Sequence, residues 1–276
     1  MRKVDLHCHS YLSDGVLSPE ELAARAQQNG VQLWALTDHD ELAGIARARN
    51  AAQALGMQHV AGVEISISWA GETVHILGLQ VDPECPTLRA GLDGIRAGRD
   101  ARAGLMSEAL SKIGIEDALQ GALRYANNPK LVGRTHFARY LVEIGVCKTV
   151  SDVFARYLTE GKPGYVPHRW VSMEQALSWI AAAGGIAVVA HPGRYKYSAL
   201  AESEMLGRFK ELGGRAIEVV TGSHSEDQYR QYAQVASHYG FLASVGSDFH
   251  GPGESRVDLG CLPPLPAGLT PVWQDW

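Results

Sequence analysis

Two histidines two residues apart end the first apolar stretch of the chain, within VDLHCHSYLSDG. Alternate residues of a strand point to the same side, so His7 and His9 share one face while Cys8 turns to the other. This spacing builds a pair that can chelate a metal ion. Asp14 follows in the loop and adds a carboxylate close by in the sequence.

The same residue types recur where the later apolar stretches end. The set comprises Asp38 and His39, then Glu64, His191, Glu218, Asp248 and His250, with His75 inside the fourth predicted strand. Apolar strands that end repeatedly in histidine or carboxylate are improbable unless these side chains bind a common polar or charged group. Six histidines and three carboxylates would serve about three divalent ions. Asp38 and Glu218 are instead predicted to support the ligands by hydrogen bonds or to cap helices.

Imidazole and carboxylate ligands without thiolates suit Zn²⁺, Mn²⁺, Fe²⁺ or Mg²⁺. Two such ions about 3.5 to 4 Å apart can hold a hydroxide between them and grip an oxyanion, which is the arrangement used for phosphoryl transfer to water. The pattern therefore indicates hydrolysis of a phosphate ester.

The elements that must position these residues alternate along the chain. The first predicted strand precedes a helix over 18–30 that begins with a capping box at Ser18 and Glu21. HVAGVEISI and ETVHILGLQ predict two strands joined as a hairpin, and the alternation resumes after residue 170. Repeated strand-helix units predict an α/β fold with a parallel sheet that closes into a barrel, whose carboxyl strand ends form the active face.

Residues 96–170 carry helical periodicity, which predicts a helical insertion between two barrel parts, 1–95 and 171–276. The insertion holds 12 Lys and Arg against 7 Asp and Glu, whereas the whole chain has a net charge of -5. This segment is therefore predicted to attract an anionic substrate. No run approaches the roughly 18 apolar residues of a membrane helix, and the N-terminus enters a strand directly, so a cytoplasmic protein without membrane contact is expected.

Five short motifs now carry a resemblance to a known family. The HCH pair, TDH, GVEI, AHPGR and SDFH occur in this order between residues 4 and 250. In this respect the chain resembles the polymerase and histidinol phosphatase (PHP) family of metal-dependent phosphoesterases. The resemblance implies a distorted seven-stranded α/β barrel with nine ligands for up to three metal ions, and all nine ligand positions match.

The resemblance also implies how the ligands are shared. The first ion would be surrounded by His7, His9, Glu64 and Asp248. Glu64 would bridge to a second ion held by His75 and His191, and a third ion would be held by Asp14, His39 and His250.

The insertion narrows the expected substrate. LVGRTHFARYLVEIGVCKTVSDVFARYLTEGKPGYVP is similar to the insertion of PHP members that remove the 3′-phosphate of nucleoside 3′,5′-bisphosphates, some of which also degrade short RNA from the 5′ end. Arg96, Arg99 and Arg102 have the spacing of one helical face, which either contacts phosphate or is solvated. Further phosphate donors are predicted at Arg134, His136, Lys162 and Arg194. One phosphate would lie at the metals and the second on these cations.

The expected activity is that of a phosphatase in which a metal-bridging hydroxide, held at Glu64 and Asp248, attacks the 3′-phosphorus and leaves a nucleoside 5′-monophosphate. The leaving oxygen would take its proton from His224 or from a metal-bound water, although His224 is equally explained as a loop histidine. The expected cofactors are three divalent ions, Mn²⁺ first among them. The expected partner is a small nucleotide or a short oligonucleotide, and no obligate protein partner is indicated.

Three alternatives remain open. The same chemistry would serve histidinol phosphate, a sugar phosphate, or an oligonucleotide cleaved from its 5′ end. A binding module with a vestigial metal site is disfavoured because no ligand is missing. A metal-dependent C–N hydrolase is disfavoured because the basic insertion suits an anionic substrate.

Overall fold

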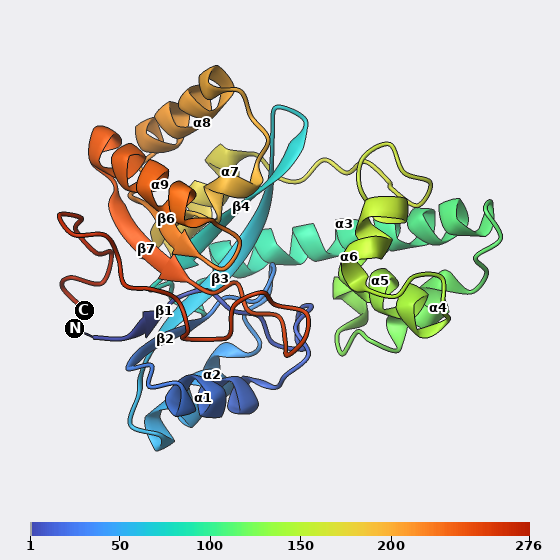
Figure 1. Cartoon of the computed structure of the whole chain (residues 1–276), viewed down its shortest axis with the longest axis horizontal. Coiled ribbons are helices and arrows are strands. Elements are labelled where there is room, and N and C mark those ends of the chain that lie inside the picture. The colour runs from blue at the N-terminus through green and yellow to red at the C-terminus, as the bar shows by residue number, and fades with distance from the viewer. Residues whose placement is uncertain (1) are drawn as a thin grey trace.

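A seven-stranded sheet forms the body of the computed structural model, which describes residues 2–276 (Figure 1). The strands follow one another in sequence order: β1 (Val4–Asp5), β2 (Leu33–Leu36), β3 (Gln58–Trp69), β4 (Glu72–Leu79), β5 (Ile186–Val189), β6 (Ala216–Thr221) and β7 (Leu242–Gly246). Leu6 donates to the Val245 carbonyl at 2.9 Å, which brings the first and last strands together. The predicted α/β barrel is confirmed.

One strand breaks the parallel arrangement. β4 runs antiparallel to both β3 and β5, whereas the other neighbours pair in parallel. The predicted β3–β4 hairpin is thus confirmed, with Ser66 paired opposite His75. Because β4 is reversed, its amino-terminal half lies at the rim where the parallel strands have their carboxyl ends.

Five helices cover the barrel: α1 (Pro19–Gln28), α2 (Ile45–Ala54), α7 (Met173–Ala182), α8 (Ala199–Glu211) and α9 (Glu226–Tyr239). The predicted capping box of α1 is present, since Ser18 accepts from the Glu21 N–H and Glu21 accepts from the Ser18 N–H. The segment after β2 does not become helical until Ile45. Glu41 folds back to accept from the N–H groups of Leu42 and Ala43, which holds this segment as a turn.

The insertion is helical, as predicted, and has its own apolar core. It contains α3 (Pro86–Ser111), α4 (Ala118–Leu123), α5 (Arg134–Glu143), α6 (Val150–Val153) and a π-helical turn over Phe154–Leu158. The predicted boundary at residue 96 falls inside α3. Leu88 and Leu92 pack in the barrel core, whereas Met106 and Leu110 pack in the insertion core, so one continuous helix joins the two.

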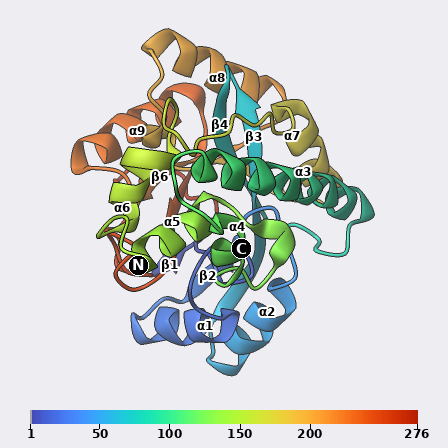
Figure 2. The ribbon, with the colours of Figure 1, turned by 90° about the vertical axis from the view of Figure 1, so that its right-hand side faces the viewer.

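The insertion stands in front of one end of the barrel. Figure 1 shows α3 running out from the barrel to the insertion, and Figure 2 shows α3, α4 and α5 in front of the strands. Between residues 2 and 276, none of the helices combines the length and apolarity needed to cross a bilayer.

The end of β7 leaves no room for a side chain beside the first histidine. A Cβ built on Gly246 would lie 2.2 Å from the Cβ of His7 and 2.6 Å from Glu218 Oε1. We predict that Gly246→Ala lowers the free energy of unfolding by about 1 to 3 kcal/mol, because overpacking forces the strand ends apart. Chemical denaturation measures this loss.

Gly207→Ala is the matched control. Gly207 lies inside α8 with no heavy atom within 4 Å of an added Cβ. Alanine there should leave stability unchanged or raise it by up to about 1 kcal/mol. Equal stability of the two variants would contradict the tight fit at Gly246.

Candidate metal centre

All nine predicted ligand side chains meet at the carboxyl rim of the barrel. His7, His9 and Asp14 follow β1, His39 follows β2, and the remaining residues come from β3, β4 and the segments after β5 and β7. Bridges between Cys8 and Phe249 and between His39 and Glu64 hold the neighbouring strand ends in register. As predicted, Cys8 turns away from the site and is fully buried in the core.

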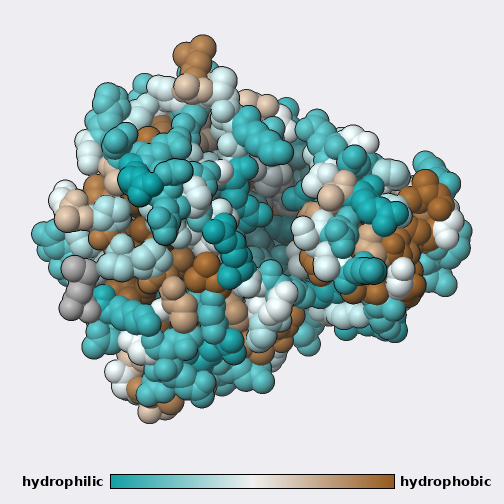
Figure 3. Space-filling view, viewed as in Figure 1, coloured by the Kyte–Doolittle hydropathy of each residue, from teal (hydrophilic) through white to brown (hydrophobic). Residues whose placement is uncertain are grey.

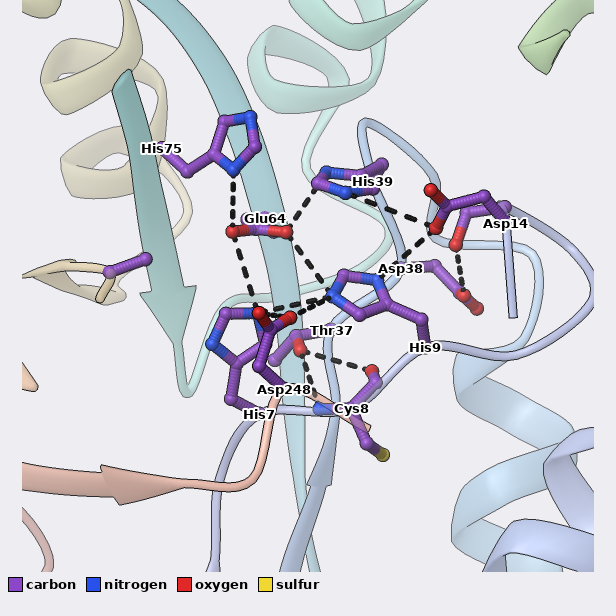
Figure 4. Close-up of polar contacts among 12 residues, drawn as sticks. His7, Cys8, His9, Asp14, Thr37, Asp38, His39, Glu64, His75 and Asp248 are labelled. Carbon is purple, nitrogen blue, oxygen red and sulfur yellow. Dashed lines mark hydrogen bonds and ion pairs between the residues drawn. The ribbon is translucent and has the colours of Figure 1, made fainter. Parts of the chain in front are cut away.

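Glu64 lies at the middle of the cluster and is fully buried (Figure 4). Its Oε1 lies 2.9 Å from His75 Nδ1 and 3.0 Å from His191 Nε2. Its Oε2 lies 2.9 Å from His39 Nδ1 and 3.2 Å from His9 Nε2. Oε1 also lies 3.4 Å from His7 Nε2, so the two carboxylate oxygens face different sets of imidazoles, as a bridging ligand requires.

The carboxylates stay ionised although they are buried. Burial alone would raise the pKa of Glu64, but the surrounding histidines, His39 foremost, hold it well below its ordinary value. Burial likewise opposes ionisation of Asp14, and His250 and His39 outweigh it and lower the pKa. Glu64 and Asp14 therefore keep their negative charges at neutral pH.

The Asp248 carboxylate lies close to both His7 and His9. Its Oδ1 lies 3.4 Å from His7 Nε2 and 3.2 Å from His9 Nε2. Asp248 has a φ of 55° and His191 a φ of 29°, both in the left-handed region. Such backbone conformations persist where surrounding structure imposes them and are common at functional sites.

The donor atoms fall into four overlapping groups: His7, His9 and Glu64; His7, His191 and Asp248; His39, Glu64 and His75; and His9, Asp14, His39 and His250. This overlap brings His9 close to the residues that the resemblance assigns to the third ion. Asp14 Oδ1 lies 3.3 Å from His250 Nε2 and 4.0 Å from His9 Nδ1.

Two buried acids outside these groups, Glu218 and Asp38, contact the residues of the donor set or the loop that carries them. Glu218 Oε1 lies 2.9 Å from His7 Nδ1, and its Oε2 accepts from the His191 N–H at 2.6 Å. Asp38 accepts from the Ser10 N–H at 2.7 Å and from the Ser13 hydroxyl at 2.6 Å. Glu218 therefore turns the Nε2 of His7 toward the centre, and Asp38 fixes the loop that carries Asp14.

Several polar atoms of the cluster are unsatisfied. Within residues 2–276, buried side-chain atoms without a hydrogen-bond partner include His9 Nδ1, Asp14 Oδ1 and His191 Nδ1, and the close pair His39 Nδ1 and Glu64 Oε2 does not have hydrogen-bond geometry either. An unsatisfied buried polar group costs about 1 to 3 kcal/mol, so their concentration in one place needs an explanation. Divalent cations fit, because imidazole and carboxylate donors without thiolates suit the first-row ions and magnesium.

The insertion touches one of these ligands directly. Thr135 donates its hydroxyl to Asp14 Oδ2 at 2.9 Å, and Arg139 donates to the Asp14 carbonyl at 2.6 Å. Arg139 also forms a two-point ion pair with Glu254, which follows β7. Helix α5 is thereby fastened to the barrel rim beside the donor set.

A cavity joins the donor set to the insertion, and Figure 3 shows the surface hollowed between the two parts. Of the predicted substrate contacts, Arg99, Arg102, Arg134 and Arg194 line it. Sequence reasoning missed Ser66, Thr73, Thr135, Phe154 and Trp170, which also line it. Only Thr135 had a signal, as a hydroxyl residue next to Arg134 in GRTH.

Four of the predicted residues do not line this cavity. His136 is fully buried, and its Nδ1 accepts from the Gly133 N–H at 3.1 Å, because it closes the first turn of α5. Lys162 is exposed at the surface of the insertion. His224 is buried beneath the loop that follows β5. Arg96, on the predicted arginine face, bonds the Asp40 carbonyl instead.

Glu218 offers a test that leaves every proposed ligand in place. We predict that Glu218→Gln weakens metal binding about 10- to 100-fold, because an amide beside His7 Nδ1 no longer fixes and polarises that ring. Titration of the apoprotein with Mn²⁺, followed by calorimetry, measures this change. Glu226→Gln, at the exposed start of α9, is the control. Unchanged affinity in Glu218→Gln would contradict the supporting role.

Known proteins resemble the chain along its whole length. A 3′,5′-nucleoside bisphosphate phosphatase of Chromobacterium violaceum is 47% identical over 275 residues, covering 100% of this chain and 96% of the relative. The 5′-3′ exoribonuclease Rnm of Salmonella typhimurium is 43% identical over 274 residues, covering 99% and 93%.

A solved structure agrees with these sequence relatives. An amidohydrolase from Chromobacterium violaceum, determined with bound sulfate and without metal, superposes with a TM-score of 0.96 at 47% identity and covers 99% of this chain and 95% of the other. The family model of the PHP domain matches residues 5–212. The chain therefore belongs to the PHP family.

Proposed function

We propose that this chain is a metal-dependent phosphatase that removes the 3′-phosphate of nucleoside 3′,5′-bisphosphates and leaves the nucleoside 5′-monophosphate. The observation that carries the proposal is the two-ended cavity. Histidine and carboxylate donors line one end, and the guanidinium groups of Arg99, Arg102 and Arg134 line the other. The full-length similarity to a 3′,5′-nucleoside bisphosphate phosphatase supports it.

The guanidinium end has more positive charge than its neighbours neutralise. At this end, Arg99 pairs with Asp40. Among the described residues, no carboxylate forms an ion pair with Arg102 or Arg134. Arg102 instead donates to the Val166 carbonyl at 3.0 Å.

The pKa of Arg102 reflects this excess charge. Burial, and after it the positive charges of Arg134 and Arg99, together lower the pKa of Arg102 to about 10. Guanidinium groups that repel one another in a buried site are stabilised by an anion between them. A phosphate matches both the charge and the forked donor geometry.

When bound in the donor set, divalent ions, for which we propose up to three Mn²⁺, supply Lewis acidity and an activated water for attack at phosphorus. Glu64 and Asp248 would hold these ions at the catalytic end. Arg194 lines the cavity beside Asp248 with its side chain half exposed, so it can also donate to the oxygens of the reacting phosphate. The insertion would hold the second phosphate and limit the access of bulk water.

Both ring nitrogens of His224 are occupied by backbone hydrogen bonds, which does not suit a general acid. Its Nδ1 donates to the Val219 carbonyl at 3.1 Å, and its Nε2 accepts from the Gly193 N–H at 2.9 Å. Burial lowers its pKa to about 4, so the ring is neutral at pH 7. We therefore assign His224 to holding the turn between His191 and Arg194, in place of the predicted proton transfer.

A second candidate activity is 5′-3′ exonuclease action on short oligonucleotides, which the similarity to the exoribonuclease favours. The same arginines would then hold the 5′-phosphate of the chain. Histidinol phosphate fits less well, because its ammonium group would meet Arg102 and Arg134 without a facing carboxylate.

A substrate panel tests the proposal. With Mn²⁺, we predict that kcat/KM for adenosine 3′,5′-bisphosphate exceeds that for adenosine 3′-monophosphate on the order of 10- to 100-fold, the value of charge-assisted hydrogen bonds to the second phosphate. AMP, histidinol phosphate and a 5′-phosphorylated oligonucleotide complete the panel. A bisphosphate no better than AMP would refute the proposal, and an oligonucleotide preferred over all others would establish the second candidate.

The pH dependence of His224→Asn tests the role of His224. We predict a lower kcat with no change in the shape of the pH–rate profile, because the variant disturbs the Gly193 turn without removing a proton donor. Loss of an ionisation from the profile would restore the general acid.

The pH dependence of folding stability gives a second test of the His224→Asn variant. The folded-state pKa of about 4 lies below the ordinary 6.5, so the neutral ring favours folding above pH 6.5, and this contribution is lost as the pH falls toward 4. Thermal unfolding of His224→Asn should therefore depend less on pH across this window than that of the unmodified chain.

A further inference from the structure

We infer that Asp40 is a positioning residue that aims Arg99 at the second phosphate of the substrate. This inference rests on the proposed function. Asp40 ends the TDHD motif, one residue after the predicted ligand His39, and it is fully buried. Its φ of 51° is in the left-handed region, which aspartate and asparagine tolerate better than most residues.

Asp40 uses its backbone to join the metal end to the insertion. Its N–H donates to the carbonyl of Glu64 at 2.8 Å, so it is tied to the strand that carries the bridging carboxylate. Its own carbonyl accepts from Arg96 at 2.6 Å. The residue is thus fixed on one side by β3 and on the other by α3.

The Asp40 carboxylate organises two groups that line the cavity. Oδ1 accepts from the Ser66 N–H at 2.9 Å, and Oδ2 accepts from the Ser66 hydroxyl at 3.2 Å. Oδ2 also accepts from Arg99 Nε at 2.9 Å and from Arg99 Nη2. Arg99 Nη2 in turn contacts the Ser66 hydroxyl at 2.9 Å, which closes a three-member network.

These contacts leave the Nη1 edge of the guanidinium for an anion. The Cζ of Arg99 lies 4.6 Å from the ring centre of Trp170, so an aromatic face and a carboxylate together fix its plane. Its Nη1 is turned toward Gly133 and lies 3.6 Å from where a Cβ on that glycine would stand. Gly133 lines the cavity beside Arg134, so Nη1 faces the anion-binding end.

Two opposite effects of Asp40 must be compared. Its negative charge opposes a nearby phosphate, whereas its grip holds a long, flexible side chain in the binding geometry before substrate arrives. Oδ2 receives two guanidinium N–H groups and a hydroxyl, so its charge is largely compensated locally. We therefore expect the orienting effect to exceed the repulsion.

Asp40→Asn separates these effects with little change in shape. Asparagine retains an oxygen for the Ser66 N–H, but its amide NH₂ then faces the donors of Arg99. Because two sets of N–H donors then face each other, the guanidinium of Arg99 is no longer held in place. We predict that KM for adenosine 3′,5′-bisphosphate rises about 10-fold while kcat changes less than about 2-fold.

The substrate lacking the 5′-phosphate is the internal control. With adenosine 3′-monophosphate, kcat/KM of Asp40→Asn should equal that of the unmodified chain, because the released contact is not used. An equal loss on both substrates would mean that Asp40 acts on the fold or on the metal end, and would overturn the inference. A lower KM for the bisphosphate would show that repulsion dominates, and would overturn it as well.

A double-mutant cycle asks whether Asp40 acts through Arg99. In an Arg99→Ala background, Asp40→Asn should cause no further loss, whereas additive losses would refute the inference. Arg96→Gln is the matched control, since Arg96 bonds the Asp40 carbonyl but does not line the cavity. Its KM should stay within about 2-fold of the unmodified value.

Arg99→Lys gives the same answer if Asp40→Asn fails to fold. Lysine retains the charge but lacks the fork that Asp40 grips. We expect it to lose most of the bisphosphate preference, and retention of that preference would show that charge without orientation suffices. Absence of any preference in the unmodified chain would instead refute the proposed function, and with it this inference.

Discussion

The structure depends on keeping a buried carboxylate ionised in the middle of a ring of imidazoles. Glu64 is fully buried, and all four of its closest nitrogen neighbours belong to histidines on other segments. This charge needs positive partners from several strands at once, so the ends of those strands must meet. The barrel meets that requirement, and the reversed strand β4 completes it by presenting His75 opposite Ser66 at the same rim.

The insertion links the donor set of the barrel to the arginines that line the cavity. Because α3 is one helix whose two halves pack in different cores, its arginines are placed relative to the donor set by a stiff element. Aromatic faces then brace the arginines: Trp170 lies against Arg99 and Arg102, and Phe154 lies against Arg134. The cavity is therefore prepared for anions before substrate binds, which limits the entropy lost on binding.

Much of the donor set could be predicted from the sequence, because strand alternation fixes which side of a strand a residue faces and parallel strands place their carboxyl ends together. The HCH pair, the β3–β4 hairpin and the supporting acid Glu218 all follow from such local rules. His224 and His136 could not be placed in this way. Their environments depend on backbone groups distant in the chain or on helix-end closure, such as the Gly193 N–H that occupies His224.

The contacts of Asp40 could not be predicted from the sequence either. Nothing in TDHD distinguishes it from a solvated loop acid, because its partner Arg99 lies 59 residues further along the chain. The predicted boundary at residue 96 falls inside α3 for a related reason. Helical periodicity marks that α3 exists but does not show that its first turns pack on the barrel.

A crystal of the manganese-loaded protein with bound AMP would test the central claim most directly. Anomalous difference density measured at the manganese edge locates the ions independently of the protein atoms. The account predicts peaks among the nine histidine and carboxylate donors, with the AMP phosphate on Arg99 and Arg134 and the ribose 3′-oxygen toward the ions. Peaks elsewhere, or the AMP phosphate at the ions with the arginines empty, would contradict it.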